Sequence, residues 1–245
     1  MGVQRIDKLL TAMGLCSRRE AAAAAKSGAI LVDGSPCRDA ARKIDPDAQQ
    51  LTFRGRPVGY QAHVYLMLHK PLGVVSATED REHKTVLDLL PAEYRARGVF
   101  PVGRLDKETS GLLLLTDDGA LGHALTSPKR GVRKVYEAKA DGVLGEVDVK
   151  AFAEGITLRD GTVCRSAELE IRCVQNGISA VSVTVCEGKY HQVRRMLAAR
   201  GAPVLELMRK AEGAVRLDPV LAPGEWRELT PEELAALRAE AAGNG

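Results

Sequence analysis

The chain has 245 residues, of which 45% are hydrophobic, and a formal net charge of only +3. It contains no run of roughly 18 apolar residues that would cross a membrane, and its start lacks the apolar segment of a secretory signal. The five cysteines and five histidines are scattered without the spacing of a metal site, so we expect a cytoplasmic protein without a metal.

The first 60 residues are basic, with ten Lys or Arg against six Asp or Glu, whereas the rest of the chain has 25 against 26. Such an excess indicates an anionic partner, nucleic acid being the commonest, although exposed charges are often only solvated. Apolar spacing and turn residues predict two helices against a small sheet, with helices over 5–13 and 17–28 and strands over 29–36 and 49–55.

Residues 56–63 carry Pro57 and Gly59 and lack apolar periodicity, which predicts a linker. We therefore expect a small domain over residues 1–60 and a larger one over residues 61–245. Strands and irregularly placed helices in the larger domain favour an α+β fold with a mixed sheet. The expected strands are 64–69, 112–116, 133–140, 163–174, 178–186 and 203–209, and the expected helices are 85–90, 119–126, 145–155, 190–200 and 230–241.

A single carboxylate, Asp106, lies between a Gly-Arg turn and the apolar run Leu112–Leu115. The run predicts a strand that is buried on both faces. A loop aspartate commonly caps a turn or pairs with a neighbour such as Arg104. A loop anchored by a core strand can instead hold a carboxylate rigidly in a cleft, where the charge needs a cation. This segment alone leaves both interpretations open.

Two basic segments could supply that cation or bind an anion. Residues 186–201 concentrate donors within a few helical turns, which suits phosphate or a buried carboxylate, although such side chains are usually a solvated helix face. In residues 127–139, Tyr136 follows four basic residues and could stack on a base or, equally well, pack against the sheet. The donors in 186–201 are Lys189, His191, Gln192, Arg194, Arg195 and Arg200.

Over nearly its full length the chain resembles the bacterial ribosomal RNA pseudouridine synthases that act on single sites and carry an S4-type RNA-binding domain in front. This resemblance implies a small S4-type domain of two helices and a sheet, then a mainly antiparallel sheet with flanking helices. The matching segments are Arg5–Leu10, Gly14–Ala21, Val32–Gly34, Lys70–Gly73, Gly103–Asp106, Thr109, Gly111–Thr116, Asp118–Gly119, Lys134–Tyr136, Glu187–Met196 and Leu221–Arg227.

The resemblance implies that Asp106 is the nucleophile of an isomerase that detaches uracil from its ribose, turns it and rejoins it through carbon 5. It assigns Tyr136 to stacking against the extruded uracil and Arg194 to pairing with Asp106, with Arg195 as second choice. Arg104 would occupy the space vacated in the RNA or hold a phosphate. Isomerisation is redox-neutral and releases nothing, so no cofactor is expected.

The implied substrate is 16S small-subunit ribosomal RNA, free or within a subunit assembly intermediate, bound by a monomer away from any membrane. The alternatives are 23S large-subunit RNA, a non-catalytic S4-type RNA-binding or ribosome assembly factor, and a hydrolase. A binding factor has no use for Asp106, and a hydrolase needs a second acid or base. In the S4-type domain the residues expected to contact RNA, mainly through phosphate, are Arg5, Lys8, Arg18, Arg19 and Lys26.

Overall fold

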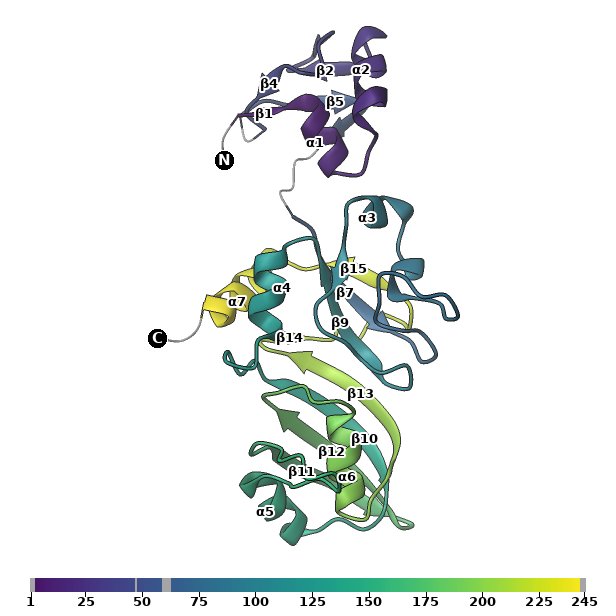
Figure 1. The fold of residues 1–245 in the computed structure, drawn as a ribbon, viewed down its shortest axis with the longest axis vertical. Coiled ribbons are helices and arrows are strands. Elements are labelled where there is room, and N and C mark those ends of the chain that lie inside the picture. The colour runs from purple at the N-terminus through teal and green to yellow at the C-terminus, as the bar shows by residue number, and fades with distance from the viewer. Residues whose placement is uncertain (1–2, 47, 59–62, 243–245) are drawn as a thin grey trace. The chain divides into compact units, whose positions relative to one another are not determined.

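The computed structural model describes residues 3–46, 48–58 and 63–242, which divide into two compact units (Figure 1). Unit 1 comprises Met1–Val64 and Leu90–Val99, and unit 2 comprises Tyr65–Leu89 and Phe100–Gly245. The boundary predicted between residues 60 and 61 lies outside the described residues. Within the described ranges, no helix is both long and apolar enough to cross a membrane.

Unit 1 packs two helices against short strands around a core that includes Ile6, Leu10 and Ile30. Ser17 and Glu20 form the capping box that starts the second helix, because each side chain accepts a hydrogen bond from the other's backbone N–H. The predicted linker is wrong at residues 56–58, which pair with a neighbouring strand. The elements are β1 (Gln4–Arg5), α1 (Ile6–Ala12), α2 (Arg18–Lys26), β2 (Ile30–Val32), β3 (Ser35–Pro36), β4 (Lys43–Ile44), β5 (Leu51–Phe53), β6 (Arg56–Val58) and α3 (Ala92–Ala96).

Unit 2 is built on a mixed, mainly antiparallel sheet. Over the described residues its strands follow the order β11-β12-β10-β13-β9-β7-β15, with β14 beside β13 and β8 beside β9. Among the named strands of the described residues, β9 and β13 are the one parallel pair of this sheet. The strands are β7 (Tyr65–Lys70), β8 (Phe100–Pro101), β9 (Ser110–Thr116), β10 (Lys134–Asp141), β11 (Glu168–Gln175), β12 (Ile178–Val185), β13 (Val204–Glu212), β14 (Val215–Arg216) and β15 (Trp226–Glu228).

Within the described residues, two apolar clusters join helices to this sheet. One core joins Phe152 and Met196, from two helices, to strands β10 to β13. The other joins Leu125 and Leu237 to Leu112 and Leu114 of β9. The helices are η1 (Val86–Leu89), α4 (Gly119–Thr126), α5 (Glu146–Glu154), α6 (Gln192–Ala199) and α7 (Pro231–Ala242), and Figure 1 labels α4 to α7.

Two predicted elements of unit 2 differ from the structure. The helix expected over 85–90 is a single 3-10 turn, closed by the Asp88 carboxylate, which accepts a hydrogen bond from the Thr85 N–H at 2.7 Å. The strand expected over 163–174 starts only at Glu168, because Val163 pairs with Thr157 in an isolated bridge outside the sheet. The β-branched composition of this stretch is therefore a poor guide to where the strand begins.

Gly111 allows β9 and β13 to approach closely just after the loop that carries Asp106. Gly111 is in register with Arg209 of β13 and has a φ of 106°. A Cβ at this position would lie 2.2 Å from the carbonyl oxygen of Arg209. Only glycine fits both the backbone conformation and the space.

We expect Gly111→Ala to lower the free energy of unfolding of unit 2 by about 3 kcal/mol or more, since the two strands must separate locally. Urea unfolding followed by the fluorescence of Trp226, the chain's single tryptophan, reports on this unit. The control is Gly119→Ala, because an added Cβ at the start of α4 meets nothing within 4 Å. Equal unfolding midpoints for the two variants would contradict the close approach.

Candidate active site

Asp106 lies in the loop between β8 and β9, and hydrogen bonds hold five consecutive carbonyls of this loop. One donor belongs to the loop itself, and the other four come from the end of β7, the segment after β7, and α6, so the loop is held by several parts of unit 2. The carbonyl of Leu105 accepts from the Ser76 hydroxyl (2.9 Å), that of Asp106 from the Thr109 N–H (3.0 Å), that of Lys107 from the Gly73 N–H (2.9 Å), that of Glu108 from the Arg194 guanidinium, and that of Thr109 from the Lys70 ammonium (2.9 Å).

Lys70 is the buried cation of this arrangement. It ends β7, is fully buried, and donates to the carbonyls of Pro71 at 3.0 Å and Thr109 at 2.9 Å. Burial lowers the pKa of Lys70 to about 8, while the negative charges of Asp106 and Glu108 partly oppose the shift. The ammonium therefore stabilises the loop at a cost in desolvation.

Asp106 faces a cavity of about 550 Å³ that lies wholly within unit 2. Its walls are the Asp106 loop, the start of β10, and the segment 186–191 before α6. The Asp106 side chain is 33% exposed, so it is accessible from the cavity. Basic side chains outnumber acidic ones in the lining, which suits a polyanionic ligand. The basic residues are Arg104, Lys107, Lys134, Lys189 and Arg209, and the acidic residues are Asp80, Asp106 and Glu187.

The ring of His191 lies beside the Asp106 carboxylate. Its Nε2 lies 3.4 Å from Oδ1 of Asp106. The residue precedes α6 in the left-handed conformation, with φ 48° and ψ 36°, which is uncommon for a residue with a Cβ. Its ring stacks on that of Tyr190, with centroids 3.9 Å apart and an angle of 17° between the planes.

Tyr136, on β10, lines the same cavity as Asp106. Burial raises the pKa of its hydroxyl, and the positive charge of Arg209 partly opposes this shift. Arg209 is itself buried in β13, where it forms an ion pair with Glu212 at 3.0 Å and donates to the carbonyl of Leu112 at 2.8 Å. A fixed ring on the cavity wall, supported by a paired buried charge, can present its face to a planar ligand.

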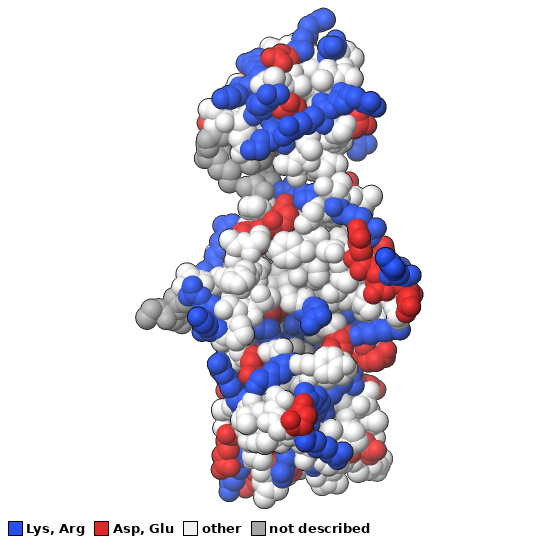
Figure 2. All heavy atoms as spheres, in the orientation of Figure 1, with Lys and Arg blue, Asp and Glu red and all other residues white. Residues whose placement is uncertain are grey.

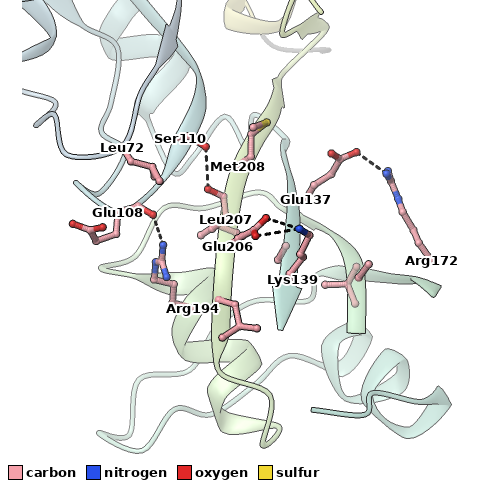
Figure 3. Close-up of a pocket in the computed structure, with 14 residues that line it drawn as sticks. Leu72, Glu108, Ser110, Glu137, Lys139, Arg172, Arg194, Glu206, Leu207 and Met208 are labelled. Carbon is pink, nitrogen blue, oxygen red and sulfur yellow. Dashed lines mark hydrogen bonds and ion pairs between the residues drawn. The ribbon is translucent and has the colours of Figure 1, made fainter. Parts of the chain in front are cut away.

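The structure does not bring Arg194 to Asp106. Arg194 donates to the Glu108 carbonyl instead and faces a second cavity of about 650 Å³ (Figure 3). Its Nε is buried and has no hydrogen-bond partner among the described residues. Arg195, the second choice, pairs with Asp160 at 2.5 Å. In this arrangement Arg194 contacts the backbone of the Asp106 loop and not the Asp106 carboxylate.

The second cavity lies against β10, β12 and β13, and its charged side chains neutralise one another. Glu137 pairs with Arg172 at 2.6 Å, and Lys139 pairs with Glu206 at 2.9 Å. The dashed lines in Figure 3 mark these contacts. Although this cavity is the larger one, it does not hold Asp106 or Tyr136, so the cavity of Asp106 is the candidate active site.

The basic residues expected to contact RNA are on the surface of their units. Arg104 is exposed at the rim of the Asp106 cavity. In unit 1, where Figure 2 shows Lys and Arg side chains spread over the visible face, Arg5 is already paired with Asp7 at 2.6 Å. The four others are exposed: Lys8, Arg18, Arg19 and Lys26.

Three residues that shape the site had no individual role in the sequence analysis. Lys70 and Arg209 are charged residues within strands that are otherwise largely apolar, and a charge at an inward-facing strand position is the signal that could have found them. Ser76 gave no such signal, because its hydroxyl meets Leu105 only through the tertiary fold.

Comparisons with known proteins agree with this geometry. Residues 64–199 match the family described as RNA pseudouridylate synthase, and residues 4–49 match the S4 domain. The chain belongs to the RNA pseudouridylate synthase family. The predicted family and fold class are thus confirmed: an S4 domain, which binds RNA, followed by a mixed sheet with flanking helices. Enzymes of this family are isomerases.

Relatives of this synthase match it over almost their full length. It is 46% identical over 233 residues to an uncharacterized RNA pseudouridine synthase, YtzG, of Bacillus subtilis (strain 168), covering 95% of this chain and 98% of that protein. It is 38% identical over 235 residues to ribosomal small subunit pseudouridine synthase A of Escherichia coli (strain K12), covering 95% and 99%. A crystal structure of a pseudouridylate synthase superposes with a TM-score of 0.65 at 34% identity, covering 96% and 99%.

The lowered pKa of Lys70 can be measured by NMR. With carbon-13 at lysine Cε, we expect one signal to titrate near pH 8 and to be missing in Lys70→Met, whereas Lys139→Met should leave it in place. Between pH 8 and 10.5 the Lys70 amine is neutral in the folded synthase and protonated in the unfolded chain. The unfolded state therefore binds more protons, and the free energy of unfolding rises with pH through this range. Titration of every lysine near 10.5 would show that Lys70 is solvated.

Proposed function

We propose that this synthase converts specific uridines of ribosomal RNA into pseudouridine, that its substrate is the small-subunit RNA, and that Asp106 is the nucleophile. The observation that carries the proposal is a carboxylate on a loop held by several hydrogen bonds, in a cavity that Tyr136 and several basic side chains also line. The ribosomal substrate is supported by the relative of Escherichia coli, which is named for the small subunit. We propose further that the enzyme acts in the cytoplasm as a monomer, on free RNA or on a subunit being assembled.

The reaction exchanges one bond of uridine for another. The bond between ribose carbon 1′ and N1 of uracil breaks, and a bond between carbon 1′ and carbon 5 forms. The proton of carbon 5 leaves and N1 gains one, so atoms and electrons balance. Asp106 serves as nucleophile in its ionised form, whether it attacks the sugar or the base.

The other residues of the cavity bind and hold the base. A uridine within folded RNA must leave its stack before Asp106 can reach it, and an aromatic ring compensates for lost stacking. Tyr136 supplies that ring in this proposal. Arg104, exposed at the rim, contacts the vacated position in the RNA or a phosphate. The exposed basic residues of the S4 domain add affinity through phosphate contacts, which salt weakens.

Asp106→Asn removes the nucleophile with almost no change in shape. Wild type and variant are incubated with small-subunit RNA, large-subunit RNA and partly assembled subunits, and pseudouridine is mapped by chemical modification and primer extension. We expect a new pseudouridine in small-subunit RNA with wild type and none with the variant. Glu108→Gln, which removes an exposed charge from the same loop, should keep the activity.

Each other outcome of this experiment has a distinct meaning. Identical maps for wild type and Asp106→Asn would end the proposal that Asp106 is the nucleophile. A new site in large-subunit RNA alone would overturn the substrate and leave the chemistry intact.

Arg194 offers a second test, since we propose that it positions the Asp106 loop through the Glu108 carbonyl. We expect Arg194→Ala to lower kcat about 100-fold with little change in KM, because a small displacement of a reacting group is costly. Arg194→Lys, which keeps a donor, should recover part of the loss. Arg172→Ala, which removes a partly exposed ion pair with Glu137 in the cavity that Arg194 also lines, should stay within about threefold of wild type. Equal losses for the two alanine variants would rule out this role.

A further inference from the structure

Tyr190 is an exposed aromatic residue at the edge of the Asp106 cavity. It is 74% exposed and lines the cavity together with His191 and Asp106. Aromatic residues make up only 4% of the chain, so a tyrosine left largely in solvent is unusual for this protein. The structure gives it no place in either apolar core of unit 2.

One face of the Tyr190 ring is already occupied. His191 stacks beneath it, with ring centroids 3.9 Å apart and a tilt of 17°. His191 is held in turn by its contact with Asp106 at 3.4 Å, and its carbonyl accepts a hydrogen bond from the Arg195 N–H at 2.9 Å. The Tyr190 carbonyl accepts a second bond, at 3.4 Å, from the Arg195 guanidinium. The two rings therefore form a platform whose position is tied to that of Asp106.

The other face of the ring is open to solvent beside a basic surface. Lys189 and Lys107 line the same cavity, and Arg104 is exposed at its rim. An open aromatic face next to cations is the arrangement that binds single-stranded nucleic acid, because bases stack on the ring while the cations contact the backbone. Such stacking depends little on which base is present, since every base has a flat face.

We propose that Tyr190 stacks on the base that neighbours the target uridine in the RNA. This inference rests on the proposed function, because the target uridine must occupy the cavity between Asp106 and Tyr136. Extrusion of the uridine leaves the adjacent base without its stacking partner, and Tyr190 replaces that partner at the mouth of the cavity. Tyr190 is thus a substrate-positioning residue that favours uridines whose neighbour is unpaired.

The test combines a protein change with an RNA change. The probe is a synthetic fragment of the RNA that wild type modifies, with the neighbouring nucleotide 5′ or 3′ of the target made abasic. We expect Tyr190→Ala to raise KM about tenfold with kcat within threefold of wild type, and Tyr190→Phe to behave as wild type. With the wild-type enzyme, one of the two abasic fragments should have a KM about tenfold above that of the intact fragment. With Tyr190→Ala, the same abasic fragment should have the same KM as the intact fragment.

The controls separate this inference from folding and from the proposed function. Val220→Ala removes another exposed apolar side chain of unit 2, 85% exposed and outside the cavity, and should change neither constant. Trp226 fluorescence reports whether each variant is folded. A Tyr190→Ala enzyme with the KM of wild type, or abasic losses that are equal in both proteins, overturns the inference while the proposed function stands. Absence of pseudouridine with wild type overturns both.

Discussion

The site depends on hydrogen bonds to the carbonyls of residues 105–109. The donors are side chains and N–H groups from β7, the segment after β7, α6 and the loop itself, and together they fix the backbone that carries Asp106. Lys70 carries the largest cost of this arrangement, since its ammonium is removed from water. Removal of the ammonium would also be costly, because loop carbonyls would then be left without hydrogen-bond partners.

A second group of buried charges supports the opposite wall of the cavity. Arg209 and Glu212 lie side by side in β13, and Lys134 lies 3.6 Å from Glu212 across the strand pair. Buried ion pairs are a weak source of stability, because desolvation offsets most of their attraction. Arg209 also binds the Leu112 carbonyl of β9, so one guanidinium joins the wall that carries Tyr136 to the strand that follows Asp106. Its position is better explained by the geometry of the site than by stability.

Local sequence patterns predicted the frame of the fold and much of its secondary structure. The apolar run Leu112–Leu115 lies in β9, and the helix expected over 119–126 is α4, which the structure shows to be capped by the Asp118 side chain. Short strands were predicted less well: β6, which forms a tight hairpin with β5, was assigned to a linker, and β15, which pairs with the distant β7, was not expected. A short strand without strong alternation has no local signal.

Sequence motifs also predicted only part of the site, because some of its contacts are set by tertiary packing. Motifs located Asp106 and Tyr136, which the fold places on one cavity. The contact of His191 with Asp106 depends on a left-handed backbone at the start of α6, and no pattern in the sequence indicates it. The assignment of Arg194 as the partner of Asp106 stays a prediction, and the structure shows its guanidinium on the loop backbone. Which face of a helix meets which loop is set by tertiary packing.

The most direct test is a crystal structure of the enzyme with an RNA fragment whose target uridine carries fluorine at carbon 5, where a proton would have to leave. The uracil ring should stack on Tyr136 with Asp106 in contact with the nucleotide, and the Asp106 loop should keep its hydrogen bonds to Lys70 and Ser76. A base bound in the cavity of Glu137 and Arg172, or a loop that releases Lys70 on binding, would contradict a rigidly presented nucleophile.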